Sequence, residues 1–214
     1  MRDVYHEMLD ELTDELVEMS RLVGSMMQRA SVALLEADRV VAEAVIADDE
    51  AVDAVNNEID HRTAEILALQ QPVASDLRMV IVAMRLGATL ERMGDLAQHI
   101  AKTARMRYPD NAVPEELRPQ FTQMAAVANR MAARMGEVIA SKDVEQARQL
   151  ENEDDQMDAL HRQVLDHLLA HPEGAVNETV DITLLNRYYE RFADHAVSVA
   201  RRIIYLVIGE RTDA

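Results

Sequence analysis

The chain has 214 residues, of which 49% are hydrophobic and 29% charged, so it is rich enough in apolar residues to exclude a disordered chain. Aromatic residues make up only 3%, and there are only 6 Gly and 5 Pro, which disfavours a β-sandwich or barrel and favours long α-helices with few turns. The formal net charge of −17 argues against a nucleic-acid partner, and the absence of Cys excludes disulfides and thiolate metal sites.

No apolar run is long enough to cross a bilayer. The longest, residues 203–208, is far shorter than the roughly 20 residues that a membrane-spanning helix needs. The first residues also lack the apolar stretch of a signal peptide. We therefore expect a cytoplasmic protein with no transmembrane segment.

The first predicted helix carries apolar residues at alternating steps of four and three, which is typical of a helix packed along a coiled-coil-like seam. These positions are Tyr5, Leu9, Leu12, Leu16, Met19, Val23, Met26, Ala30 and Ala33. A second segment repeats the pattern more loosely at Val52, Val55, Ile59, Ile66 and Leu69. Asp38 lies between them and predicts a short break, as Asp143 does at the equivalent place in the second half of the chain.

The third predicted helix has two apolar stripes. One consists of Leu77, Ile81, Met84 and Ala88, and the other of Leu86, Leu90, Met93, Ala97 and Ile100. Two stripes indicate a helix that packs against two neighbours, as in a three-helix bundle.

Prolines and an internal repeat divide the chain. Pro109, Pro114 and Pro119 mark a linker, while Ser75 and Asn177 follow the other two prolines at distances that suit helix N-caps. The first half of the chain then recurs, at an offset of 105 residues up to Asp53 and of 99 residues from Glu91 onward. We predict an all-α fold of two tandem three-helix bundles with six long helices, the repeats spanning residues 1–108 and 114–214.

Pairs of acidic residues four positions apart occur at equivalent places in both repeats. They are Asp49 and Asp53, Glu91 and Asp95, Asp154 and Asp158, and Glu190 and Asp194. Glu91 and Asp95 continue the stripe that begins at Leu77, so we expect them to face a neighbouring helix. Four carboxylates would then converge in each bundle and provide hard oxygen ligands for Mg²⁺, Mn²⁺ or iron.

An arginine-neutralised cluster is an equally open alternative, because Arg78, Arg85 and Arg92 follow one another at heptad spacing on the same helix. A ferritin-like metal enzyme is disfavoured, because Glu58 and His61 form the single Glu-x-x-His pair where that class needs two. A carboxylate-bridged metal enzyme and a purely structural helical adaptor nevertheless stay open as alternatives. Histidines next to the acidic pairs could act as ligands or as surface groups, and these are His161 and His195.

The motifs together resemble the PhoU family of phosphate-uptake regulators. The resemblance rests on residues 71–78, which read Gln-Pro-Val-Ala-Ser-Asp-Leu-Arg, and on the two Glu-Arg-x-x-Asp motifs at Glu91 and Glu190. It implies a non-enzymatic, often homodimeric negative regulator of phosphate transport and phosphate-starvation signalling. Its implied partners are the ATPase subunit of a phosphate-specific ABC transporter, at the inner face of the membrane, and a sensor histidine kinase.

The resemblance also implies multinuclear metal ions, iron in some members, bound by the paired acidic motifs. Carried over to this sequence, the implied metal ligands are Asp49, Asp53, Glu91, Asp95, Asp154, Asp158, Glu190 and Asp194. The second hairpin, residues 171–174, lacks the Gln-Pro…Asp-Leu-Arg pattern of the first. The two repeats are therefore not expected to be equivalent in every contact.

Overall fold

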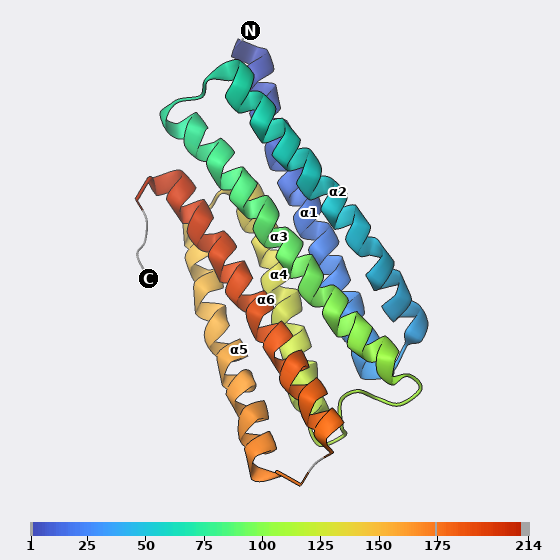
Figure 1. The fold of residues 1–214 in the computed structure, drawn as a ribbon. Coiled ribbons are helices and arrows are strands. Elements are labelled where there is room, and N and C mark those ends of the chain that lie inside the picture. Colours follow the sequence, from blue (N-terminus) through green and yellow to red (C-terminus); the bar gives the residue numbers. More distant parts are fainter. Residues whose placement is uncertain (1, 174, 211–214) are drawn as a thin grey trace.

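The computed structural model describes residues 2–173 and 175–210, and within them the chain forms six long α-helices and no strand. The helices are α1 (Arg2–Glu36), α2 (Arg39–Gln70), α3 (Ala74–Arg107), α4 (Arg118–Ser141), α5 (Val144–Ala170) and α6 (Val176–Ile208). Helices α1 to α3 pack together as one three-helix bundle, and α4 to α6 as a second (Figure 1). The predicted fold class is confirmed.

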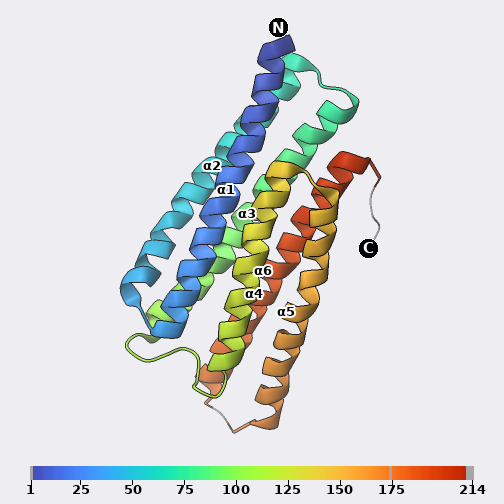
Figure 2. The same cartoon turned by 180° about the vertical axis from the view of Figure 1, so that it is seen from behind.

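The bundles lie side by side rather than end to end. Helix α3 packs against α6, and α1 packs against α4. Figure 1 shows α3 and α6 in the centre with α2 and α5 on the flanks, while Figure 2, from behind, shows α1 and α4 in front. One hydrophobic core runs through both repeats, so the division at residues 108 and 114 stays a prediction about domains.

The seam of α1 forms the centre of the first bundle. From Leu12 to Ala33 every seam position is at most 1% exposed. On α3 the stripe from Leu86 to Ile100 is buried in the same way. The other stripe, which includes Leu77 and Ala88, is only half-buried or exposed, and Met84 is 44% exposed. This stripe lies at the margin of the surface that α3 buries against α1, α2 and α6.

The short breaks before α2 and α5 have the same cap. The Asp38 carboxylate accepts a hydrogen bond from the Val41 N–H at 3.0 Å, and Asp143 accepts from the Glu145 N–H at 2.8 Å. These bonds satisfy N–H groups that have no partner in the first turn of a helix. The predicted N-caps Ser75 and Asn177 are wrong, because both residues lie inside their helices.

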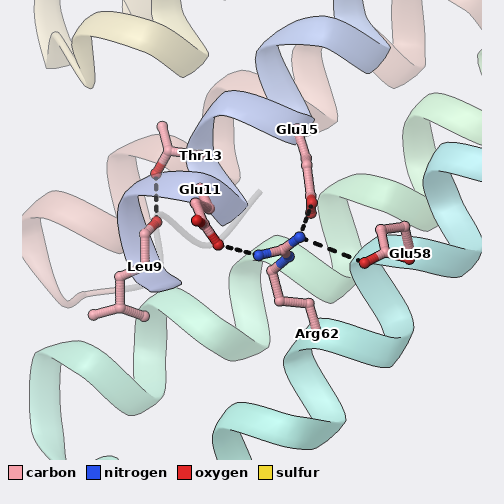
Figure 3. A network of polar contacts seen from close by, with 6 residues as sticks. All are labelled: Leu9, Glu11, Thr13, Glu15, Glu58 and Arg62. Atoms are coloured by element: carbon pink, nitrogen blue, oxygen red, sulfur yellow. Dashed lines mark hydrogen bonds and ion pairs between the residues drawn. The ribbon is translucent and has the colours of Figure 1, made fainter. Parts of the chain in front are cut away.

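Polar contacts join helices that are distant in sequence. Arg62 on α2 forms ion pairs with Glu11 and Glu15 on α1 and with Glu58 one turn before it (Figure 3). The buried Tyr189 hydroxyl on α6 shares a hydrogen bond of 2.8 Å with the Ser31 hydroxyl on α1. The second contact joins the two repeats, and a misplaced α6 would leave a buried hydroxyl without a partner.

None of the described helices combines the length and the apolar composition needed to cross a membrane.

Candidate metal centre

The acidic pairs of the first repeat lie on adjacent helices. Asp49 and Asp53 are one turn apart on α2, and Glu91 and Asp95 are one turn apart on α3. Gly94 allows the close approach of these helices, because a Cβ at that position would lie 3.2 Å from a Val52 methyl and 3.7 Å from the Asp49 Oδ1 atom. The fold thereby brings the four carboxylates to one seam, which we call the α2–α3 carboxylate cluster.

The electrostatics of this cluster show that its members lie close enough to repel one another. Burial raises the pKa of Asp49 above its ordinary value, and the charges of Asp95 and Asp53 raise it further. Burial likewise raises the pKa of Glu91, and Asp95, Asp53 and Asp49 add to the effect. None of the four forms an ion pair with any described cation. The cluster therefore carries a negative charge that no described side chain neutralises directly.

The second repeat forms an equivalent α5–α6 carboxylate cluster from Asp154 and Asp158 on α5 and Glu190 and Asp194 on α6. Burial raises the pKa of Asp154 to about 6, with further contributions from Asp158, Asp194 and Glu190. Burial and Asp194 also raise the pKa of Glu190, although its ion pair with Arg187 opposes the shift. In both repeats, the carboxyl pKa values are thus raised by burial and by the negative charges of neighbouring carboxylates.

One oxygen of the second cluster has no hydrogen-bond partner. Glu190 is 12% exposed, and its Oε1 atom accepts from Arg187 while its Oε2 atom is buried and unpaired within the described structure. A buried carboxylate oxygen without a partner is costly, and a cation is one means of satisfying it. The carboxylate oxygens of both clusters are hard ligands that suit Mg²⁺, Mn²⁺ or iron.

The clusters supply suitable ligands without forming a finished site. Among the described residues, no three His, Cys, Asp or Glu side chains are arranged so as to hold one metal ion. Asp53, Asp158 and Asp194 are exposed, whereas Asp49 and Glu91 are half-buried. Binding of a cation would therefore require the exposed carboxylates to turn toward the seam.

The three arginines at heptad spacing on α3 do not form ion pairs with the α2–α3 carboxylate cluster. Arg78 donates to the Leu206 carbonyl oxygen on α6 at 3.1 Å and lies over the Tyr205 ring. Arg85 acts electrostatically on Arg202 of α6, and Arg92 lines a pocket between α3 and α6. The arginines follow the α3–α6 seam, because α3 presents different faces to α2 and α6.

The histidines differ in their relation to the clusters. His61 is exposed on α2. His161 lies near the second cluster, since it acts electrostatically to lower the pKa of Glu190, and its Nδ1 atom is buried without a hydrogen-bond partner in the described structure. His195 is half-buried and lines the pocket between α3 and α6. His161 is therefore the histidine best placed to supplement the carboxylates.

Without metal, the protein is expected to become more stable as the pH falls from 7.5 to 5.5. The pKa of Asp154 is about 6 in the folded chain against 3.8 for the free group, so the native state binds more protons between these values and stability falls as the pH rises. Because Asp154 is partly exposed, solvent screening reduces the effect to a melting-temperature change on the order of 1–3 °C. Calorimetry in chelator at several pH values would measure it.

The change Asp154→Asn should reduce this pH dependence, whereas the control Asp60→Asn, at an exposed position of α2, should leave it unaltered. A melting temperature that falls between pH 7.5 and 5.5 in the parent protein would contradict the expectation.

These features define a class of tandem helical-bundle proteins in which each repeat places two acidic pairs on one helical seam. Comparison with known families then identifies the family. Residues 16–104 and 121–203 both match the PhoU domain. The chain belongs to the PhoU family.

Named relatives align along nearly the whole chain. A Mycobacterium tuberculosis protein named phosphate-specific transport system accessory protein PhoU homolog 2 is 47% identical over 210 residues, covering 98% of this chain and 99% of the relative. PhoU homolog 1 of Mycobacterium leprae is 45% identical, covering 98% of this chain and 95% of the relative.

Solved structures agree with the fold. The crystal structure of PhoU from Pseudomonas aeruginosa superposes with a TM-score of 0.88 at 27% identity, covering 96% of this chain and all of that one. The phosphate transport system regulatory protein PhoU from Streptococcus pneumoniae superposes with a TM-score of 0.89 at 28% identity, covering 98% of this chain and all of that one.

Proposed function

We propose that this chain is an accessory protein of phosphate transport that acts as a non-enzymatic negative regulator of phosphate uptake and of phosphate-starvation signalling. The observation that carries the proposal is its 45–47% identity, over 98% of the chain, to proteins named as phosphate-specific transport system accessory proteins. The regulator works in the cytoplasm at the inner face of the membrane. Its partners are the ATPase subunit of a phosphate-specific ABC transporter and a sensor histidine kinase.

An exposed apolar stripe supports a role in protein contact. Val176, Val180 and Leu184 follow one another at steps of four on α6 and are 77%, 50% and 44% exposed. Residues four apart share one face of a helix, so these side chains form a continuous apolar strip. Apolar strips on an otherwise charged surface are common at protein–protein contacts. The strip could equally be the contact surface of a homodimer. Analytical ultracentrifugation would test whether the chain forms one.

The proposal includes metal ions as a structural part of the regulator. Each carboxylate cluster holds either a single metal ion or a multinuclear metal centre. The candidate metals are iron, manganese and magnesium. Support comes from the raised carboxyl pKa values in both clusters and from the unpaired Oε2 atom of Glu190. A bound cation would supply positive charge that fixes α2 against α3 and α5 against α6.

Deletion of the gene in phosphate-rich medium is expected to raise the expression of phosphate-starvation genes severalfold, because the restraint on the kinase is lost. Transcript levels of those genes would measure the effect. Reintroduction of the parent chain should restore repression. The experiment needs a strain that encodes no second PhoU-family protein, because such a protein would itself maintain repression. Starvation genes that stay repressed in the clean deletion would contradict the proposed function.

The apolar stripe offers a second variant in the same strain. Val180→Asp with Leu184→Asp places two charges in the strip, and we expect it to fail to restore repression while retaining the helical content of the parent. The matched control is Val40→Asp with Leu69→Asp, which adds the same charge at exposed positions of α2. Equal complementation by both variants would show that the strip contacts no partner.

A further inference from the structure

A pocket between α3 and α6 gathers basic side chains in an otherwise acidic protein. It has a volume of about 310 Å³ and lies on the seam that joins the two repeats. The residues that can donate hydrogen bonds to an anion are Arg92 and His99 on α3 and Arg187, Tyr188, Arg191 and His195 on α6. The chain as a whole carries a net charge of −17, so this concentration of cations is a local exception.

The internal repeat explains how two arginines meet here. Arg92 and Arg191 are the second residues of the two Glu-Arg-x-x-Asp motifs. Because α3 and α6 run side by side in opposite directions (Figure 1), the motifs lie near each other across the seam. Each motif thus places its arginine at the seam between the two repeats.

Two of the three arginines of this pocket form no ion pair with the described residues. Arg92 and Arg191 form none with any described residue, whereas Arg187 is paired with Glu190. One acid, Asp95, also lines the pocket.

The two unpaired arginines lie beside a half-buried histidine. Arg92 on α3 and Arg191 on α6 line the pocket together with His195. The two guanidinium groups therefore meet at the same point of the seam. Gathering like charges there is unfavourable unless an anion joins them.

We propose that this pocket binds a phosphoryl-type oxyanion, either inorganic phosphate or the terminal phosphate group of a nucleotide. Arginine suits such a ligand because its planar guanidinium donates two parallel hydrogen bonds to neighbouring oxygens. The Tyr188 hydroxyl, the His195 ring and a guanidinium from each repeat supply donors from both helices. The volume is at the lower end of the range for ligand pockets, which favours a small ion or a single group.

The bound anion would join α3 to α6 and hence one repeat to the other. The pocket adjoins both metal clusters, because Asp95 of the α2–α3 carboxylate cluster lines it and Arg187 pairs with Glu190 of the α5–α6 carboxylate cluster. Binding is independent of the proposed regulatory function, because it is measured on the purified chain.

The test is a calorimetric titration of the full chain, treated with chelator and dialysed, with inorganic phosphate, sulfate and ATP in separate experiments. The variant Arg92→Gln with Arg191→Gln removes the two unpaired guanidinium groups. The control Arg105→Gln with Arg148→Gln removes the same charge from exposed positions of α3 and α5. We expect the control to bind phosphate like the parent and the pocket variant to bind about a hundredfold more weakly.

Circular dichroism and melting curves establish that each variant is folded, which is expected because Arg92 and Arg191 are exposed. Tighter binding of ATP than of phosphate, lost in the same variant, would identify a nucleotide as the source of the phosphoryl group. Phosphate binding that is present in the untreated parent and absent in the chelator-treated parent would overturn the proposal, since the anion would then be a ligand of the metal. Equal weakening in the pocket variant and the control, or no binding by the parent, would overturn it as well.

Discussion

Replacing Glu91 with Gln and Asp95 with Asn is expected to release metal from the α2–α3 carboxylate cluster and to lower the melting temperature in metal-containing buffer. A ligand present at a hundredfold excess over its dissociation constant stabilises a protein by roughly 2.7 kcal/mol, which is about 5–10 °C for a chain of this size. In chelator the same variant should melt at the parent's temperature or slightly above it, because repulsion involving Asp49 and Asp53 is reduced. Elemental analysis and calorimetry measure both effects.

The control for this experiment is Asp60→Asn with Glu65→Gln, which removes two exposed carboxylates from α2 outside the cluster. This control should change neither the metal content nor the difference in melting temperature between metal-containing buffer and chelator. The corresponding pair in the second repeat, Glu190→Gln with Asp194→Asn, should repeat the result if both clusters are loaded. A cluster variant that melts like the parent in both buffers, with unaltered metal content, would show that the acids form only a solvated face.

Replacing Arg107 with Met is expected to destabilise the protein strongly, because it leaves the carboxylate of Asp181 buried without its partner. Arg107 at the end of α3 pairs with Asp181 near the start of α6, and the Asp181 side chain is only 7% exposed. Breaking a buried ion pair costs about 3–5 kcal/mol. Because the Arg107 side chain is 34% exposed, solvent screening makes the loss smaller than for a fully buried pair, and we expect the melting temperature to fall by several degrees.

A second change should restore much of this loss. Arg107→Met with Asp181→Leu removes both charges, and apolar residues often replace a buried ion pair at little cost. The matched control is Arg39→Met, which breaks an exposed ion pair with Glu43 and should leave the melting temperature nearly unchanged. Equal melting temperatures for Arg107→Met and Arg39→Met would show that the Arg107–Asp181 pair does not hold α3 to α6.

Much of the fold followed from local patterns. The steps of four and three from Leu12 to Ala33 identified a buried seam, and Asp38 and Asp143 identified the breaks before α2 and α5. Both signals act over one or two helical turns, which is the range over which side chains on one helix interact. The N-caps expected at Ser75 and Asn177 were wrong, because the Val73 and Ala175 backbones begin those helices without a side-chain cap.

The candidate site was predictable in composition and only partly in arrangement. The repeated acidic pairs indicated which carboxylates share a helix face, and the structure brings Asp49 near Asp95 and Asp154 near Asp194, so that each neighbour raises the pKa of its partner aspartate. The stripe that was expected to bury Glu91 and Asp95 is itself only partly buried, because it lies at the margin of the surface that α3 buries against α1, α2 and α6. No sequence pattern predicted the close contact at Gly94, because that contact depends on the position of α2 against α3.

The sequence by itself determined the helices, their buried faces and the repeat, because helical periodicity and capping depend on residues a few positions apart. Only the tertiary structure decided which seams carry which charge. Arg78, Arg85 and Arg92 share a helix with Glu91 and Asp95, yet the three arginines lie along the seam with α6 rather than pairing with those acids. That arrangement depends on packing α3 against α6, which begins 69 residues after α3 ends, and periodicity within one helix does not specify its neighbours.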